Sequence, residues 1–481
     1  MARESAFNKV LNKGEVFALA FGAMIGWGWV VLAGDWIGQG GSAGAMIAFA
    51  MGGLMVLFVG LTYAELTPAM PKCGGEFVFS MRALGKFPSF ICTWAIILGY
   101  VGVVAFEACA LPTVIQYIIP AFGKGPVLYT VAGFDIRIQW LIVAILVALL
   151  ITVINYIGIK SAAIFNSVLT VVIAVAGILL VVSSVFSGEA SNMQPLFEDG
   201  FPGILSVAVM TPFMFVGFDV LPQASEEMNI PPKNIGFIMM LSILMAVIWY
   251  IVIIFAVSFV MSKTDLVAAE TSLTTAEAMS KAFHWEHAGK ILVIGGMAGI
   301  LTSWNAFFVG GSRAIYAMGE ANMVPRLFAR LHPKFKTPGP AIILIGIISC
   351  IAPFFGRRMM VWLTDAGSAG VVVAYLLVSL SFLILRVKEP NMERPYKIKN
   401  GPVIGVLAVV LSLAMGILYI PGVSPSALTP VEGIIFLSWV VLGVIFGIVA
   451  KLVYKDKFGQ SENLIYPMGS VDRKNQEARA H

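Results

Sequence analysis

Long apolar segments with almost no charge recur along the whole chain, and they restrict it to a membrane. A bilayer core about 30 Å thick is crossed by roughly 20 apolar residues in a helix. Twelve segments qualify, centred on 16–38, 43–69, 88–118, 139–158, 162–186, 203–226, 236–261, 288–318, 340–356, 360–385, 402–421 and 431–453. Charged residues make up 12% of the chain, about half the share usual in soluble domains. We therefore predict an all-α integral membrane protein with twelve transmembrane helices.

The positions of lysine and arginine predict how the chain is oriented. With the N-terminus placed in the cytoplasm, 24 of the 31 Lys and Arg residues fall on the cytoplasmic side and 7 fall outside. Positive residues are enriched in the cytoplasmic loops of membrane proteins. We therefore predict a multi-pass protein of the cytoplasmic membrane with both termini inside. This orientation accounts for the net charge of +5 without a nucleic-acid partner.

Little of the chain lies outside the predicted spans. The segment 1–15 is a short cytoplasmic N-terminus, the outer loop 262–287 has room for a short amphipathic helix, and the polar tail 456–481 is predicted to be disordered. The four cysteines and four histidines show no disulfide, metal or catalytic spacing. We therefore expect no metal, no cofactor and no enzymatic activity. The function must sit within the helix bundle.

Two of the spans contain residues that interrupt a helix. The first contains Gly22, Gly26 and Gly28 around two tryptophans, and the sixth, TPFMFVGFDVLPQASEEM, contains Gly217 and Asp219 between two prolines. Unsatisfied backbone groups are costly in hydrocarbon, so a broken span must line a wet cavity or be buried in protein. Paired interruptions in corresponding spans of two halves indicate a transporter site built from half-helices. The alternative is that the glycines serve close helix packing.

Three longer motifs resemble one family of membrane proteins. YAELTPAMPKCGGEFVFSMRALG (Tyr63–Gly85) resembles the end of span two and the following re-entrant loop of amino acid–polyamine–organocation permeases. GFDVLPQASEEMNIPPKNI (Gly217–Ile235) is similar to their span-six signature. SWNAFFVGGSRAIYAMGEANMVPRLFARLHPKFKTPGPAI (Ser303–Ile342) is similar to their span eight and the loop behind it. The motifs occur in the family's order and agree with the span count.

The resemblance implies a leucine-transporter-like fold of two inverted five-helix repeats. The repeats would occupy 16–186 and 203–385, with helices 1 and 6 broken, and helices 11 and 12 would occupy 402–453. It also implies alternating access, with the substrate carboxylate on the span-one backbone and its ammonium on span-one and span-six carbonyls. Phe213 matches the aromatic residue that closes over the substrate. The substrate-binding candidates are Met24, Ile25, Gly26, Trp27, Gly28, Trp29, Glu107, Phe213 and Gly217.

The sequence departs from the family pattern at two positions. The usual span-one motif is Gly-Ser/Ala-Gly, and here Trp27 stands between the two glycines. Its indole would shrink the pocket, point away from it, or lie over an ammonium, a role for which Trp29 is a second candidate. Many amino acid carriers of this group place a lysine in span five, where this chain has Ile173, and Lys160 comes too early. Cation coupling would then come from other residues.

Two carboxyl groups and two hydroxyl groups within the spans are candidates for binding or coupling. Glu107, in the middle of span three, would pair with a substrate ammonium, carry a coupling proton, or bond to a neighbouring helix. Asp219 matches a family position linked to proton sensing, and its alternative role is to cap the half-helix after the break. Thr302 and Ser303 match hydroxyls that coordinate sodium in relatives, and their alternative is bonding within their own helix.

Other residues of the spans carry structural expectations. Glu226 and Glu227 are expected at the cytoplasmic end, paired with Lys or Arg of nearby loops in a gate or a purely structural role. Glu65 is expected to behave in the same way. Trp36 is expected to anchor the chain at the membrane interface.

The leading prediction is a secondary active transporter that takes up a small amino acid or related amine, coupled to a proton or a sodium ion. The alternative is an ethanolamine or polyamine permease or exchanger. Glu107 and the span-one tryptophans favour a cationic substrate, whereas the glycines at the break favour a substrate with a carboxylate. Alternatives outside this class are a channel, for which no repeated filter sequence is visible, and a substrate sensor, for which the tail is short. We expect a monomer or homodimer in the lipid bilayer.

Overall fold

The computed structural model describes residues 7–268, 273–356, 358–424 and 427–461. The helices are α1 (Lys13–Met24), α2 (Gly28–Gly40), α3 (Ser42–Ala69), α4 (Glu76–Leu84), α5 (Lys86–Ile118), α6 (Ile138–Ile157), α7 (Ile159–Ser187), α8 (Gly200–Ala208), α9 (Thr211–Phe215), α10 (Val220–Gln223), α11 (Pro232–Val260), α12 (Lys263–Ala268), α13 (Thr274–Ala282), α14 (Ala288–Glu320), α15 (Gly339–Ile351), α16 (Arg358–Lys388), α17 (Gly401–Leu418) and α18 (Pro430–Tyr454). β1 (Val127–Val131) and β2 (Phe134–Arg137) form an antiparallel hairpin.

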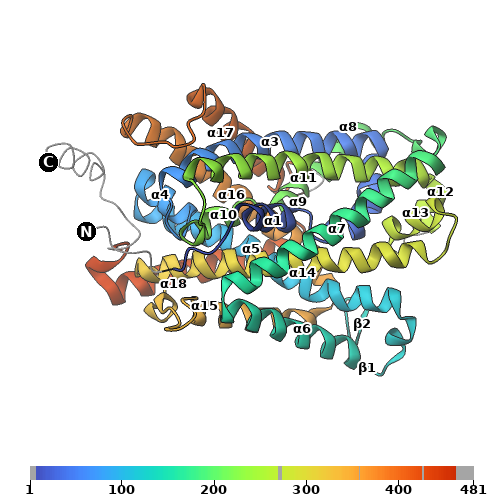
Figure 1. The fold of residues 1–481 in the computed structure, drawn as a ribbon, viewed down its shortest axis with the longest axis horizontal. Coiled ribbons are helices and arrows are strands. Elements are labelled where there is room, and N and C mark those ends of the chain that lie inside the picture. The colour runs from blue at the N-terminus through green and yellow to red at the C-terminus, as the bar shows by residue number, and fades with distance from the viewer. Residues whose placement is uncertain (1–6, 269–272, 357, 425–426, 462–481) are drawn as a thin grey trace.

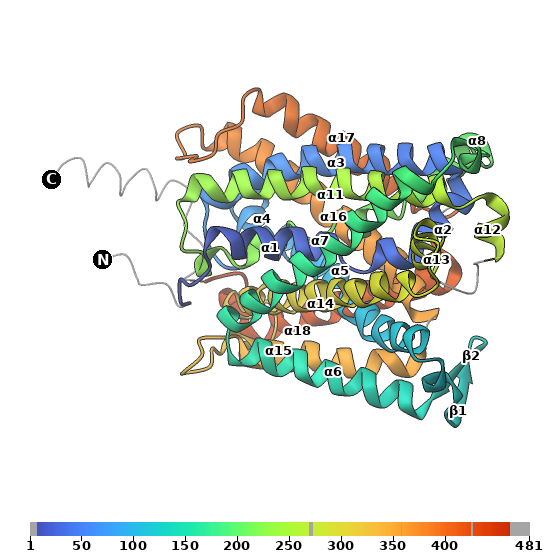
Figure 2. The same ribbon diagram turned by 45° about the vertical axis from the view of Figure 1, so that its right-hand side comes forward.

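The long helices form a bundle with two distinct ends (Figure 1). α1 begins and α18 ends at one of them, which the sequence predicts to be cytoplasmic, and we name it the inner end (Figure 2). The hairpin, α12 and α13 lie at the opposite end, which we name the outer end. The predicted outer loop therefore contains two short helices, with 269–272 outside the described residues. Most of the predicted tail, 462–481, and the start of the predicted N-terminal segment, 1–6, also lie outside them.

Ten helical segments among the described residues are long and apolar enough to cross a bilayer, with α1 and α2 counted together as one. Two of the twelve predicted segments fall short of that length. The ninth is a shorter apolar helix, Gly339–Phe355, and the sixth is divided into α8, α9 and α10. The chain is thus an almost wholly α-helical membrane protein. The count of twelve spans, the inverted repeat and the predicted domain boundaries stay predictions.

The broken helices are enclosed by long ones. α5 packs against α14 and α16, α3 packs along α11, and α7 packs against both α14 and α1. α1, α9 and α10 lie between these longer helices (Figure 1). α18, by contrast, lies at the edge of the bundle, and only 11% of its apolar stretch is buried. A continuous helix tolerates contact with lipid, because it satisfies its own backbone groups. Interrupted backbone is therefore kept away from lipid.

Candidate functional site

The first span is interrupted halfway, as predicted. α1 ends at Met24 and α2 begins at Gly28, and the residues between them leave the helix. Carbonyl groups freed near the end of α1 accept hydrogen bonds from other helices. Thr302 donates to the Gly22 carbonyl at 3.0 Å, and Tyr250 donates to the Met24 carbonyl at 2.8 Å. The break is therefore buried in protein and partly satisfied by side chains, which is the condition for irregular backbone at membrane depth.

Glu107 is a residue of α5, and its carboxyl group lies beside Gly26, just before the start of α2. The Ser303 hydroxyl donates to one oxygen of this carboxyl group, and the other oxygen is buried without a hydrogen-bond partner among the described residues. A Cβ atom on Gly26 would lie 3.2 Å from the carboxyl oxygen and 2.9 Å from the Ser303 oxygen, so glycine is what leaves room for this contact. An acidic group is stabilised at a helix N-terminus by the helix dipole. Glu107 therefore occupies the place that the resemblance assigns to a substrate carboxylate.

The second break lies in the sixth span and contacts the first. The chain makes a turn between α9 and α10, and Gly217 within it has a φ of +139°. A Cβ atom on Gly217 would lie 2.8 Å from the Ala23 Cβ and 2.9 Å from the Met24 nitrogen. Position 217 therefore requires glycine for its backbone conformation and for the approach of the two breaks.

Asp219 stabilises this second break. Its carboxyl group accepts hydrogen bonds from the Gly217 N–H at 2.8 Å and the Tyr375 hydroxyl at 3.4 Å. The Tyr100 hydroxyl donates to its backbone carbonyl at 3.1 Å. The side chain makes no capping hydrogen bond to α10, so the capping alternative is wrong. The carboxyl is fully buried, and its role in coupling stays a prediction.

A small cavity of about 20 Å³ lies where the two breaks meet. Its lining includes six of the nine predicted substrate-binding residues: Met24, Gly26, Trp27, Gly28, Glu107 and Phe213. The other three, Ile25, Trp29 and Gly217, lie outside the lining. A cavity of this size holds about one water molecule. The site is therefore closed around a space too small for an amino acid.

Most of the other lining residues carry no recognisable signal in the sequence. They are Ala23, Val103, Phe106, Met214, Val216, Tyr250, Ser303 and Phe307, and of these only Ser303 was a candidate. Apolar residues within apolar spans look alike until the packing decides which ones face the cavity. Proximity to Glu107 in the sequence is the one signal that could have pointed to Phe106.

The three span-one tryptophans are all buried. The Trp27 ring packs on Gly296 of α14, where a Cβ atom would lie 2.3 Å from it. Trp29 turns away from the cavity, and its indole N–H donates to the Ile25 carbonyl at 3.0 Å. Trp36 packs against Phe49 with a ring distance of 4.4 Å. The prediction that Trp36 anchors the chain at the membrane interface is therefore wrong, because the ring lies inside the bundle.

The sodium candidates bond to protein groups. Thr302 donates to the carbonyls of Gly22 and Gly299, each at 3.0 Å, and Ser303 donates to Glu107 and to its own helix. Ile173, at the position where many relatives have a lysine, is fully buried. No group of three or more His, Cys, Asp or Glu side chains that could hold a metal ion occurs in the described part of the chain.

The inner end is closed below the cavity by buried ion pairs. Arg313 of α14 and Glu227 pair at 2.8 Å, with 1% and 4% of their side chains exposed. The backbone N–H groups of Val10 and Leu11 both donate to the Glu227 carbonyl, at 2.9 and 3.0 Å. The segment before α1 is thereby tied beneath the second break.

The neighbouring acids at the inner end are paired as well. Glu226 pairs with Lys72 at 3.5 Å, and Glu65 pairs with Arg386 and with Arg394, the latter at 3.0 Å. The pairing expected for Glu226, Glu227 and Glu65 is thus confirmed. Lys160 pairs with Glu15 at 2.6 Å, near the start of α1.

Phe213 lines the cavity from α9, and α8, which precedes α9 in the chain, lies at the outer end (Figure 2). Its ring packs against Phe106 at 5.9 Å, and Gly102 and Gly367 leave space for it on α5 and α16. The Thr275 hydroxyl of α13 donates to the Trp29 carbonyl at 3.0 Å and so ties α13 to α2. Phe213 therefore lines the cavity, and its closing over a substrate stays a prediction.

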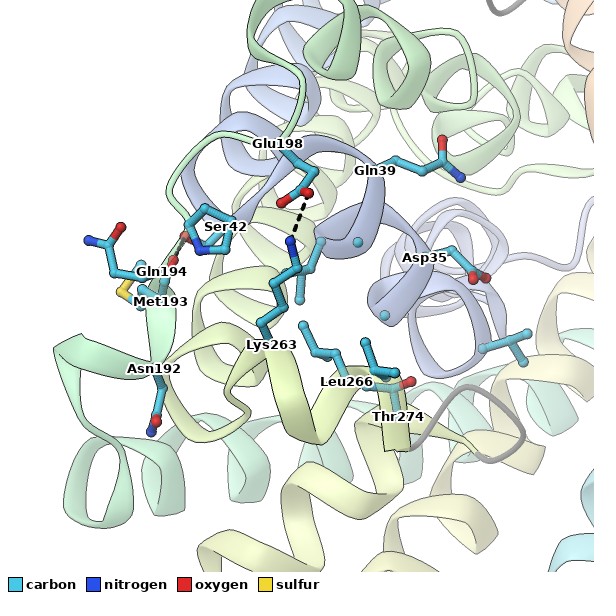
Figure 3. A pocket seen from close by; sticks show the side chains of 16 residues that line it. Asp35, Gln39, Ser42, Asn192, Met193, Gln194, Glu198, Lys263, Leu266 and Thr274 are labelled. Carbon is cyan, nitrogen blue, oxygen red and sulfur yellow. Dashed lines mark hydrogen bonds and ion pairs between the residues drawn. The ribbon is translucent and has the colours of Figure 1, made fainter.

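A larger hollow of about 370 Å³ lies at the outer end beside α2. Figure 3 shows Asp35, Gln39, Glu198 and Lys263 around it. Lys263 and Glu198 form an ion pair at 2.8 Å with both side chains partly exposed. This hollow shares no lining residue with the cavity at the breaks. The outer end thus contains a hollow much larger than the cavity at the breaks.

Comparison with known proteins agrees with this geometry. A family model described as amino acid permease matches residues 12–462. The chain belongs to the amino acid permease family. It is therefore a transporter of the amino acid–polyamine–organocation superfamily, and not an enzyme, as the resemblance in the sequence predicts.

Three relatives illustrate the family's range. The chain is 27% identical to a branched-chain amino acid permease of Bacillus subtilis, over 85% of this chain and 88% of that one. It is 25% identical to a methylthioribose transporter of the same organism, over 92% and 94% of the two chains. It is 22% identical to an aspartate–proton symporter of that organism, over 86% and 79%. Membership therefore fixes the class of protein and leaves the substrate open.

Proposed function

We propose that this permease takes up a small amino acid with an apolar side chain by alternating access. The observation that carries the proposal is the meeting of two broken spans at one closed cavity, with the start of α2 on one side and Phe213 on the other. Half-helix ends of this kind offer N–H groups to an anion and carbonyl groups to a cation. Closure toward both ends of the bundle supports a carrier rather than an open pore.

The amino acid would displace Glu107 from the start of α2. Its carboxylate would accept hydrogen bonds from the backbone N–H groups of the first break, and its ammonium would contact the carbonyl groups at the end of α1. Much of the remaining lining is apolar and includes Val103, Phe106 and Met214. Pockets of this character orient a ligand with a few polar groups and accept its apolar part elsewhere. An aliphatic side chain is the part that fits this lining.

We propose a proton as the coupling ion and inward as the direction of transport. Glu107 and Asp219 are buried within the bundle, and carboxyl groups inside membrane proteins mark proton relays. The Thr302 hydroxyl and the Gly22 carbonyl satisfy each other directly, which supports sodium less well. The predicted orientation, with both termini in the cytoplasm, and a monomeric or homodimeric state belong to the same proposal.

A cationic amine without a carboxylate is the second candidate substrate. The Glu107 carboxyl group already lies beside Gly26 of the span-one break, where an amino acid would place its own carboxylate. If Glu107 stays there during transport, the substrate needs only an ammonium group, which the Glu107 carboxylate would pair with. The two candidates differ in whether Glu107 is displaced.

Thermal stabilisation of the purified permease by matched ligands separates them. L-leucine is compared with isopentylamine, and L-alanine with ethylamine, each with and without sodium. A ligand at 100 times its Kd adds about 2.7 kcal/mol to the stability of the folded state. Stabilisation by the amino acids alone supports the first proposal, and stabilisation by the amines alone replaces it with the second. A requirement for sodium would overturn proton coupling.

Counterflow in proteoliposomes tests transport itself. Vesicles loaded with unlabelled L-leucine should transiently accumulate labelled L-leucine, because a carrier exchanges substrate across a saturable site. A binding protein that does not transport would show stabilisation without counterflow. A channel would show flux that does not saturate.

A further inference from the structure

Asp219 has a second buried carboxyl group near it, that of Glu76, on the side of the inner end. Glu76 is the first residue of α4, and Asp219 lies in the second break. Both side chains are fully buried. Neither forms an ion pair with a lysine, arginine or histidine of the described residues. Glu76 therefore has no structural charge partner, and the transport site described above does not use it.

The two carboxyl groups are joined through α10. Gln223 follows Asp219 by one helical turn, and its side-chain N–H group donates to the Glu76 carboxyl. Gly75, next to Glu76, packs so closely on Pro222 that a Cβ atom there would lie 2.6 Å from the proline side chain. The start of α4 and the whole of α10 therefore form one contact. A movement of α10 changes the surroundings of both acids.

Several polar atoms around Glu76 have no hydrogen-bond partner within the described structure. One oxygen of Glu76, the hydroxyl of Tyr63 and the amide oxygen of Gln223 are all buried and unpartnered. Tyr63 lies on α3 beside the Glu76 carboxyl. The unpartnered oxygens of Glu76 and Gln223 are two acceptors, and the Tyr63 hydroxyl is one donor beside them. A carboxylic acid carries one O–H donor that a carboxylate lacks. The cluster therefore has one donor fewer than its two acceptors need while Glu76 is charged, and a proton on Glu76 supplies one more.

The charged groups around the pair do not neutralise the two acids in place of that proton. The titratable groups that face it are Tyr63 of α3, Cys92 and Tyr100 of α5, and Tyr375 of α16. Arg82 of α4 is paired with Glu389, and Arg313 of α14 is paired with Glu227. Burying a carboxylate without a cation is very unfavourable, and two acids close together cannot easily both be charged.

We propose that Glu76 and Asp219 form a proton-binding pair that releases its proton to the inner side when the inner end opens. The inference rests on proton coupling as proposed above and adds the group that carries the proton. Glu227, the partner of Arg313, lies four residues after the end of α10, at the end of a short 3-10 helix. Opening of that ion pair would draw α10 and Gln223 away from Glu76 and admit water. The proton then leaves the Glu76 carboxyl for water, and the carboxylate is stabilised by hydration.

The test compares Glu76→Gln with wild type in proteoliposomes, with L-leucine as the probe. Glutamine keeps the shape and the contact to Gln223 but binds no proton. We expect counterflow, which needs no net proton movement, within about threefold of wild type, and accumulation driven by a pH gradient to fall at least tenfold. Glu76→Asp should restore accumulation in part. Glu189→Gln, an equal change on an exposed residue between α7 and α8, should change neither.

Chemical labelling of the wild-type protein tests the proposal without a transport assay, and it stays informative if the Glu76→Gln variant does not fold. A carbodiimide reacts with protonated carboxyl groups in apolar surroundings, and mass spectrometry of wild-type protein locates the adduct. We expect labelling of Glu76 that decreases as the pH rises. Labelling independent of pH, no labelling, or full pH-driven accumulation by Glu76→Gln would overturn the proposal, and protection by sodium would make the pair a cation site instead. Absence of counterflow in wild type would defeat the proposed function alone.

Discussion

The inner and outer ends of the bundle close the substrate site by different means. At the inner end Arg313 and Glu227 form an ion pair with both side chains almost fully buried, and backbone hydrogen bonds hold the segment before α1 against it. On the side of α8 and α9 the cavity is lined by the ring of Phe213, without an ion pair among the described lining residues. The ion pairs of the outer end are partly exposed, with Lys263 58% and Lys281 44% exposed.

The difference predicts which end opens first. Breaking a buried ion pair by removing one partner costs about 3–5 kcal/mol, whereas an exposed pair contributes about 0–1 kcal/mol. We therefore expect the closed permease to open outward more readily than inward. An importer benefits from this order, because the substrate then reaches the site from outside before the inner end is released.

The largest effect is expected for Arg313→Ala. The variant leaves Glu227 buried without its cation. The closed state of the inner end should therefore be destabilised by about 3–5 kcal/mol, and the inner end should open more often. Cys73 is buried, and its thiol contacts the Arg313 carbonyl at 3.9 Å. Its alkylation rate should rise at least a hundredfold. Cys109, which is buried on α5, serves as the control in the same protein, and an unchanged rate at Cys73 would contradict the role of the ion pair.

Gly217→Ala should affect both ends, because the two breaks touch at this residue. The added methyl group meets Ala23 and Met24, and a residue with a side chain is strained at this φ by about 1–3 kcal/mol. We expect L-leucine counterflow to fall about tenfold to a hundredfold. Gly133→Ala is the matched control, because Gly133 also has a positive φ, +81°, but no neighbour within 4 Å. Equal losses in the two variants would show that backbone strain alone matters.

Phe213→Ala should weaken the outer closure alone. Loss of the ring opens the cavity outward, and we expect the apparent affinity for L-leucine to fall about tenfold, equivalent to about 1.4 kcal/mol. Cys73 at the inner end should stay as slow to alkylate as in wild type. Phe134→Ala, at the outer hairpin, is the control for loss of an aromatic ring. Faster labelling of Cys73 would show that the two closures are not independent.

The smallest effect is expected for the exposed ion pair between Asp265 of α12 and Lys281 of α13. Burial by itself would raise the pKa of Asp265, but hydrogen bonds from Lys281 and Ser262 outweigh it and lower the pKa to about 2. A lowered pKa contributes stability above the ordinary value of about 4, and that contribution is lost as the pH falls toward 2.

Thermal melting of Lys281→Ala measures this contribution. The variant should lose less than about 1 kcal/mol near neutral pH, and the difference from wild type should shrink as the pH falls toward 2. A difference that grows at low pH would contradict the sign of the pKa shift. A loss as large as that of Arg313→Ala would remove the contrast between the two ends.

The sequence by itself determined the features that depend on local chemistry. Membrane spans follow from apolar length, and the break at Gly26 follows from a glycine-rich stretch that a lipid-facing helix does not need. The resemblance placed Phe213 at the cavity, and charge alone predicted that Glu227 is paired at the inner end. Each of these follows from the residue types and their order along the chain.

The tertiary structure decided which side chains meet, because that depends on how helices distant in the sequence are rotated and packed. Trp29 and Trp36 looked like a cavity residue and an interface anchor, but other helices enclose both. Tyr250 lies in an apolar run without any signal, yet it bonds to the first break. Glu76 stands between two ordinary motif residues, and only the approach of α10 makes it a buried acid without a cation. Contacts between helices, rather than the pattern within one, therefore fix the chemistry of this permease.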